Sequence, residues 1–200
     1  PLGADGDFVS SVSLRQMLHP FPVCVGLFAV SAFALHGAIY LNMKTEGELH
    51  QRIRRWMWTC FWLFLFMYIV VTVFAVVAIP RATASFRNHP WAWIIVILNI
   101  LAIANIPRAI YLGRPLRAFL TSACVIAAFT FLFGLALYPN LIVSSISPEY
   151  DLSIPRAAST EKTLGIMAIV AFLGMPFVLS YTAVIYWVFR GKVVLHEDSY

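Results

Sequence analysis

Long uncharged runs of apolar residues alternate with short polar segments along the chain. In four places such a run reaches the length of about 18 or more residues that a helix needs to cross about 30 Å of hydrocarbon. These runs cover residues 21–43, 56–79, 118–143 and 163–189. All are continuous, without the alternation of lipid-facing and lumen-facing positions that a membrane β-strand requires. The pattern therefore predicts four transmembrane helices.

A fifth apolar run is shorter than the others. It covers residues 91–106 and ends before Pro107 and Arg108. Arg108 and Arg114 can direct their charged ends toward the membrane surface, and the apolar residues that follow Arg108 can lengthen the helix. We therefore predict a fifth span at about 91–112. The expected fold class is an all-α integral membrane protein, a bundle of about five transmembrane helices forming a single domain over residues 1–200.

The composition agrees with a membrane protein and excludes several other classes. Hydrophobic residues make up 61% of the chain and charged residues 12%, with a mean hydropathy of +0.83. Such a chain is too apolar to be disordered or to form a soluble domain of 200 residues. Its three cysteines lie inside apolar runs without metal-ligand spacing, so we interpret them as packing residues.

The positive charge of the chain lies mainly at the ends of the apolar runs. The net charge of +5 therefore indicates anionic lipid as the partner, and we expect no binding of nucleic acid. One face of the membrane would carry nine of the fourteen cations: Lys44, Arg52, Arg54, Arg55, Arg108, Arg114, Arg117, Arg190 and Lys192. The other face would carry five: Arg15, Arg81, Arg87, Arg156 and Lys162. The positive-inside rule then predicts an external N-terminus and a cytoplasmic C-terminus.

One ionisable side chain, His36, lies well inside a predicted span. Ionisable groups are costly in a membrane, which makes His36 a candidate haem ligand or proton relay. The alternative that we favour is a neutral imidazole hydrogen-bonded to a neighbouring helix, with small Ala34 and Ala38 allowing close approach. No second histidine is placed in the other spans for bis-histidine ligation.

Two asparagines and a proline interrupt the apolar pattern elsewhere. Asn99 and Asn105 are six residues apart, which places them about 240° apart on a helix and so on different faces. For both we expect hydrogen bonds to other helices, with contact to a ligand as the alternative. Pro176 in the middle of the last span predicts a kink, because it frees the carbonyl of Phe172.

Two polar connections carry further candidates. Residues 44–52 alternate in charge, and Glu46 or Glu48 could gather protons or pair with nearby arginines; a solvated helical hairpin is the alternative. Residues 144–162 should form an external loop that leads into a helix capped by Ser159 or Thr160, with Glu161 in its first turn. Nucleotide-binding, hydrolase and zinc-protease motifs do not occur in the sequence, which excludes those enzyme classes.

Several short motifs follow one another along nearly the whole chain. They are HPF at 19–21, LHGAIYLNMKTEGELH at 35–50, LYP at 137–139 with SS at 144–145, AAS at 157–159 before TLGIM at 163–167, and SYTAVIYW at 180–187. In order and spacing they resemble the C-terminal half of subunit II of the cytochrome bd-type quinol oxidases, including the cyanide-insensitive branch. The chain starts with Pro1 in a polar segment, and we expect it to be a fragment of a longer subunit.

The resemblance implies a two-subunit respiratory oxidase of the bacterial plasma membrane. Such a complex oxidises quinol, reduces dioxygen to water and contributes to the proton-motive force. Its haems belong to subunit I, while subunit II has two helical bundles and serves as partner, scaffold and part of the proton or oxygen routes. The implied partners of this chain are oxidase subunit I, the N-terminal half of subunit II, membrane lipid and quinol or quinone.

No catalytic residue carries over from the resemblance by motif, no metal-binding residue is predicted, and the cofactor-binding residues are unknown at this stage. The intramembrane acids linked to proton uptake in that family lie mainly in the N-terminal half. We therefore expect this chain to bind no haem or metal through its own side chains, with quinone as a further candidate ligand, and not to be catalytic alone. The alternative hypothesis is a non-redox membrane protein, either a small permease or an assembly scaffold.

Overall fold

Five long helices dominate the computed structural model, which describes residues 18–78, 86, 89–144 and 147–191. They are α2 (Pro20–Lys44), α3 (Gly47–Ala78), α5 (Ala92–Tyr111), α6 (Pro115–Leu137) and α8 (Glu161–Val188). Within these described ranges, five helices are long and apolar enough to cross a membrane. The predicted all-α membrane fold class is therefore confirmed, and the shorter run at 91–112 is one of the five helices.

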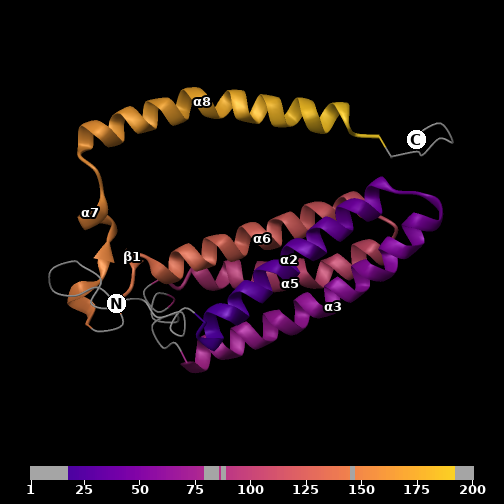
Figure 1. Ribbon diagram of the computed structural model, residues 1–200, viewed down its shortest axis with the longest axis horizontal. Helices are drawn as coiled ribbons and strands as arrows, with labels where there is room; N and C mark the ends of the chain where they lie inside the picture. Colours follow the sequence, from indigo (N-terminus) through magenta and orange to yellow (C-terminus); the bar gives the residue numbers. More distant parts are fainter. Residues whose placement is uncertain (1–17, 79–85, 87–88, 145–146, 192–200) are drawn as a thin grey trace.

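Four of the five helices pack together, and the fifth lies apart from them. α2 contacts α3 and α6, and α5 contacts α6. Figure 1 shows these four helices side by side, with α8 running along the group at a distance. The largest fully buried side chains lie in the four-helix group: Ile39, Met57, Phe64 and Ile106. All residues of α8, by contrast, are exposed.

Two helix boundaries differ from the predicted spans for reasons that the sequence explains. α3 begins at Gly47, ahead of the apolar run at 56–79, because the charged and polar residues in between continue the same helix. α6 ends at Leu137, whereas the apolar run continues to residue 143. Pro139 disfavours a helical conformation at Tyr138, and the apolar residues beyond it form a strand instead. Ile79, the last residue of the second predicted span, lies outside the described residues.

The connection between α6 and α8 contains a small ordered hairpin. Its elements are β1 (Asn140–Ile142), the 3-10 helix η1 (Pro148–Tyr150), β2 (Leu152–Ser153) and α7 (Ile154–Ala157). β1 pairs antiparallel with β2. The carboxylate of Asp151 accepts a hydrogen bond from the Ser144 backbone N–H at 2.7 Å and one from the Asn140 side-chain amide at 3.0 Å. Asp151 therefore links β1 and the residue Ser144 that follows it to the start of β2.

Hydrogen bonds define both ends of α8. At the N-terminal end, Thr160 is the cap, because its hydroxyl accepts a bond from the backbone N–H of Thr163 at 3.4 Å. At the C-terminal end, the ammonium group of Lys44 at the end of α2 donates to the carbonyls of Phe189 and Gly191, the latter at 3.0 Å. A lysine from the four-helix group therefore satisfies carbonyls that the end of α8 leaves free. α8 runs through Pro176, and a kink there stays a prediction.

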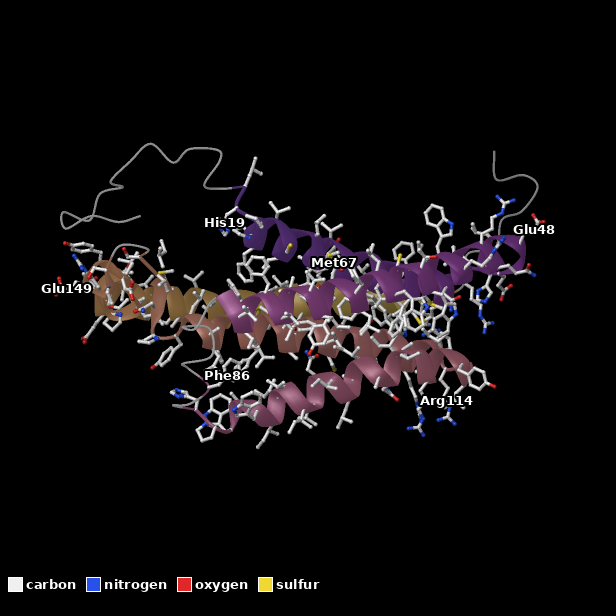
Figure 2. All side chains as sticks on the ribbon, turned by 90° about the horizontal axis from the view of Figure 1, so that it is seen from below. His19, Glu48, Met67, Phe86, Arg114 and Glu149 are labelled. Atoms are coloured by element: carbon white, nitrogen blue, oxygen red, sulfur yellow. The ribbon has the colours of Figure 1, made fainter. Side chains whose placement is uncertain are left out.

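The up-and-down path of the helices gathers most of the predicted cytoplasmic cations at one end. Figure 2 shows Glu48 and Arg114 at this end, and His19, Phe86 and Glu149 at the opposite one. The described cations near helix ends on the Arg114 side are Lys44, Arg52, Arg54, Arg55, Arg108, Arg114, Arg117 and Arg190. Arg15, Arg81, Arg87 and Lys192 lie outside the described residues. The orientation of this basic end toward the cytoplasm stays a prediction.

Candidate functional site

A polar contact between α2 and α6 lies inside the four-helix group. The Nδ1 atom of His36 is 2.8 Å from the hydroxyl oxygen of Ser122. Ser122 is buried, with 3% of its surface exposed, and its hydroxyl donates to the carbonyl of Phe119 at 2.8 Å. The hydrogen bond to a neighbouring helix that we favoured for His36 is therefore present, and Ser122 is its partner.

The two bonds of Ser122 favour one tautomer of the His36 ring. A serine hydroxyl has one hydrogen, and the bond to the Phe119 carbonyl uses it. Both bonds can then form only if Nδ1 of His36 carries a hydrogen and donates it to Ser122. In the neutral ring this arrangement leaves Nε2 as the acceptor.

Aromatic rings continue this contact toward the basic end of the molecule. The His36 ring stacks on Phe119, with ring centroids 4.6 Å apart, and the Tyr40 ring lies 5.7 Å from the same phenylalanine. The Lys44 ammonium lies 5.8 Å from the centroid of the Tyr40 ring, within the range of a cation–π interaction. His36, Tyr40 and Lys44 follow one another at intervals of four residues, and they therefore share one face of α2. The contacts of this face hold the imidazole of His36 and the ammonium group of Lys44 in fixed positions.

The two asparagines of α5 have different surroundings. The Asn105 amide donates to the hydroxyl of Thr121 on α6 at 3.2 Å, which is the interhelical bond expected for it. Asn99 is 3% exposed, and its carbonyl oxygen has no hydrogen-bond partner among the residues that the structure describes. The bond to another helix expected for Asn99 is therefore not found at this oxygen.

A groove of about 610 Å³ runs along the outside of α5 and α6 beside Asn105. Its lining residues are Leu101, Ala102, Ala104, Asn105, Arg108, Leu120, Thr121 and Cys124. The groove was not found from the sequence, although the adjacent hydroxyl residues Thr121 and Ser122 in an apolar run are a signal of helix contacts there. Of the cysteines interpreted as packing residues, Cys24 and Cys60 are partly buried and Cys124 is exposed.

Clustered metal ligands were sought in the part of the chain that the structure describes. Across residues 18–78, 86, 89–144 and 147–191, no group of three or more His, Cys, Asp or Glu side chains could hold a metal ion. The groove is lined by neither histidine nor methionine, the commonest axial ligands of electron-transfer haems. His36 bonds to Ser122 through Nδ1 and stacks one ring face on Phe119. These are the contacts of a side chain that joins α2 to α6.

The bond between His36 and Ser122 predicts a measurable coupling between the two residues. In a double-mutant cycle with His36→Leu and Ser122→Ala, we expect a coupling free energy of about 0.6 kcal/mol and at most about 1.7 kcal/mol, the range for hydrogen bonds between membrane helices. The measurement is the free energy of SDS-driven unfolding of the protein purified from membranes. Thr130, whose hydroxyl bonds only within α6, supplies the control pair, since His36→Leu and Thr130→Ala should be additive. Additive effects of the His36 and Ser122 changes would contradict the bond.

Comparison with known proteins extends over nearly the whole chain. The family described as Cytochrome bd terminal oxidase subunit II matches residues 3–189. Two relatives share this similarity at low identity: Cytochrome bd-I ubiquinol oxidase subunit 2 of Escherichia coli strain K12, 26% identical over 208 residues, and Cytochrome bd ubiquinol oxidase subunit 2 of Bacillus subtilis strain 168, 25% identical over 200 residues. A third, Probable cytochrome oxidase subunit 2 of Haemophilus influenzae, is 27% identical over 195 residues.

The lengths covered by these comparisons are unequal. The alignments include 91%, 96% and 85% of the present chain for the three proteins in turn, but 55%, 56% and 52% of the relatives. The chain therefore spans about half the length of the relatives that it matches.

Proposed function

Since the chain belongs to the cytochrome bd terminal oxidase subunit II family, we propose that it is part of a respiratory complex that oxidises quinol and reduces dioxygen to water. The observation that carries this proposal is the family match over residues 3–189, which includes all five apolar helices. In this role the chain resides in the bacterial plasma membrane as a multi-pass protein. The complex contributes to the proton-motive force when quinol releases its protons on one side and dioxygen reduction consumes protons from the other.

Within this complex the chain acts as a haem-free partner and scaffold. Haem supplies electron transfer and dioxygen reduction when bound in subunit I. The polar contacts of the present chain support a structural role, because His36 is tied to Ser122 and Asn105 to Thr121. Each of these bonds joins one helix of the four-helix group to α6 and so fixes how the helices pack.

The proposed partners follow from the length of the relatives and from the lone helix α8. The relatives contain nearly as much sequence again, which we assign to an N-terminal half of subunit II. Oxidase subunit I is the second protein partner, and quinol or quinone the small-molecule partner of the complex. α8 contributes apolar surface on all sides in the present chain, as a helix does that contacts lipid or another membrane protein.

Affinity purification from native membranes tests this proposal. The chain is tagged in its own host, the membranes are solubilised in a mild detergent, and the purified material is examined by absorption spectroscopy and protein mass spectrometry. We expect stoichiometric recovery of a haem-bearing subunit together with the tagged chain. Recovery of a tagged protein free of haem and of any oxidase subunit would contradict the proposal and favour the small permease or assembly scaffold.

A further inference from the structure

The groove between α5 and α6 changes in polarity along its length. Arg108 lies in the last turn of α5, at the basic end of the molecule, and is exposed. The hydrogen-bonded pair Asn105 and Thr121 lies next along the groove. Leu101 and Cys124 line it further from the basic end. A cation is therefore followed by neutral polar groups and then by an apolar wall.

The spacing of these groups matches the dimensions of a membrane lipid. Leu101 and Arg108 are seven residues apart on one helix, a distance of about 10 Å along the helix axis. Over that length a phospholipid passes from its phosphate through the ester-linked glycerol to the start of its acyl chains. The apolar part of the wall is completed by the small side chains of Ala102 and Ala104, while Leu120 lies level with the polar pair. Small side chains on a helix surface leave room for an acyl chain to lie against it.

The charge around the groove favours an anionic occupant. Between Glu48 and Glu149 the sequence contains no acidic residue, so the whole α5–α6 hairpin carries cations without a carboxylate of its own. Arg114 directly precedes α6 at the same end as Arg108, and Arg117 lies in the first turn of α6. Figure 2 shows nitrogen-tipped side chains gathered at this end around Arg114. A phosphate group is the natural partner of such arginines, because the guanidinium group can donate two parallel hydrogen bonds to it.

We propose that this groove is a binding site for one anionic phospholipid. Arg108 binds the phosphate, the Asn105 and Thr121 pair faces the glycerol and ester region, and Leu101, Ala104 and Cys124 contact an acyl chain. The charge of Arg108 distinguishes this occupant from a quinone, whose head group is neutral and gains less from a guanidinium group. The site lies outside the His36 contact and does not depend on the proposed oxidase function.

Lipid titration of the purified, delipidated complex tests the site directly. The probes are palmitoyl-oleoyl phosphatidylglycerol, which is anionic, and phosphatidylcholine with the same acyl chains, which is zwitterionic. Binding is followed by native mass spectrometry, a readout that does not involve oxidase activity. We expect Arg108→Gln to weaken phosphatidylglycerol binding about tenfold or more, because a charge-assisted hydrogen bond is lost, and to weaken phosphatidylcholine binding less, because the choline ammonium of that lipid already offsets its phosphate charge.

Two further variants separate the groove from the general positive charge of this end. Arg54→Gln removes an exposed cation near the same end, on α3 and outside the groove lining, and should leave phosphatidylglycerol binding as in the wild type. Ala104→Phe keeps the charge but fills the groove, and should weaken the binding of both lipids. The proposal would be overturned by equal losses in Arg54→Gln and Arg108→Gln, by wild-type binding in Ala104→Phe, or by a quinone occupying the groove in the native complex in place of phospholipid.

Discussion

Replacing Phe64 by alanine should destabilise the four-helix group by about 2–3 kcal/mol. Phe64 on α3 is 1% exposed, and its ring centroid lies 5.7 Å from that of Phe28 on α2 and 6.3 Å from that of Phe129 on α6. Truncation leaves a cavity where three helices meet. We place the cost below the value of about 3–5 kcal/mol for water-soluble cores, because lipid is as apolar as the core and only the loss of packing remains.

Phe66→Ala is the matched control for this prediction. Phe66 lies one half-turn further along α3 and is 59% exposed, so its ring contributes little to packing within the group. Both variants are compared by the free energy of SDS-driven unfolding of the purified complex. A loss for Phe66→Ala as large as that for Phe64→Ala would mean that the described core is not where the helices hold together.

Leucine should have opposite effects on stability at the two asparagines of α5. Asn99→Leu removes a buried carbonyl oxygen that has no partner among the described residues, and the added apolar contacts should raise stability by about 1 kcal/mol. Asn105→Leu removes the donor to Thr121 and should lower stability by about 0.6–1.7 kcal/mol. The two changes are the same in chemistry and lie on one helix, so each serves as the control of the other.

The same unfolding measurement decides this second prediction. A substantial loss of stability in Asn99→Leu would contradict it and would mean that the Asn99 carbonyl has a partner, such as a buried water molecule. Asn99→Asp gives a further comparison. It adds charge to a buried position, and it should therefore lower the free energy of unfolding relative to Asn99→Leu.

The helices could be predicted from the sequence because a membrane span leaves a plain signal. An uncharged run such as 21–43 or 163–189 must satisfy its backbone internally, and a helix does so within one segment. The ends of the helices were harder to predict. At residues 47–55 charged side chains belong to α3 ahead of the apolar run, and at residues 138–143 apolar side chains continue beyond the end of α6. In both places the helix ends where the backbone conformation changes, which the hydropathy of the side chains does not report.

The site could be predicted only in part, because partners on other helices depend on packing. His36 was recognisable as an ionisable group inside a span, but Ser122 lies 86 residues away in the sequence. The separation of Asn99 and Asn105 on the helix was predictable from their spacing. The bond of Asn105 to Thr121, and the lack of a partner for the Asn99 carbonyl oxygen among the described residues, were not predictable. The groove beside Arg108 was likewise hidden, since its lining residues come from two helices and none of them is unusual alone.

Oxygen consumption by membranes that lack the chain tests whether the chain is a subunit of a quinol oxidase. The coding region of the chain is deleted in its own host, in a background without other terminal oxidases, and quinol-driven oxygen uptake is measured with an oxygen electrode. We predict that uptake disappears on deletion and returns when the wild-type chain is restored. Undiminished quinol-driven uptake in the membranes without the chain would contradict its role as a subunit of the oxidase.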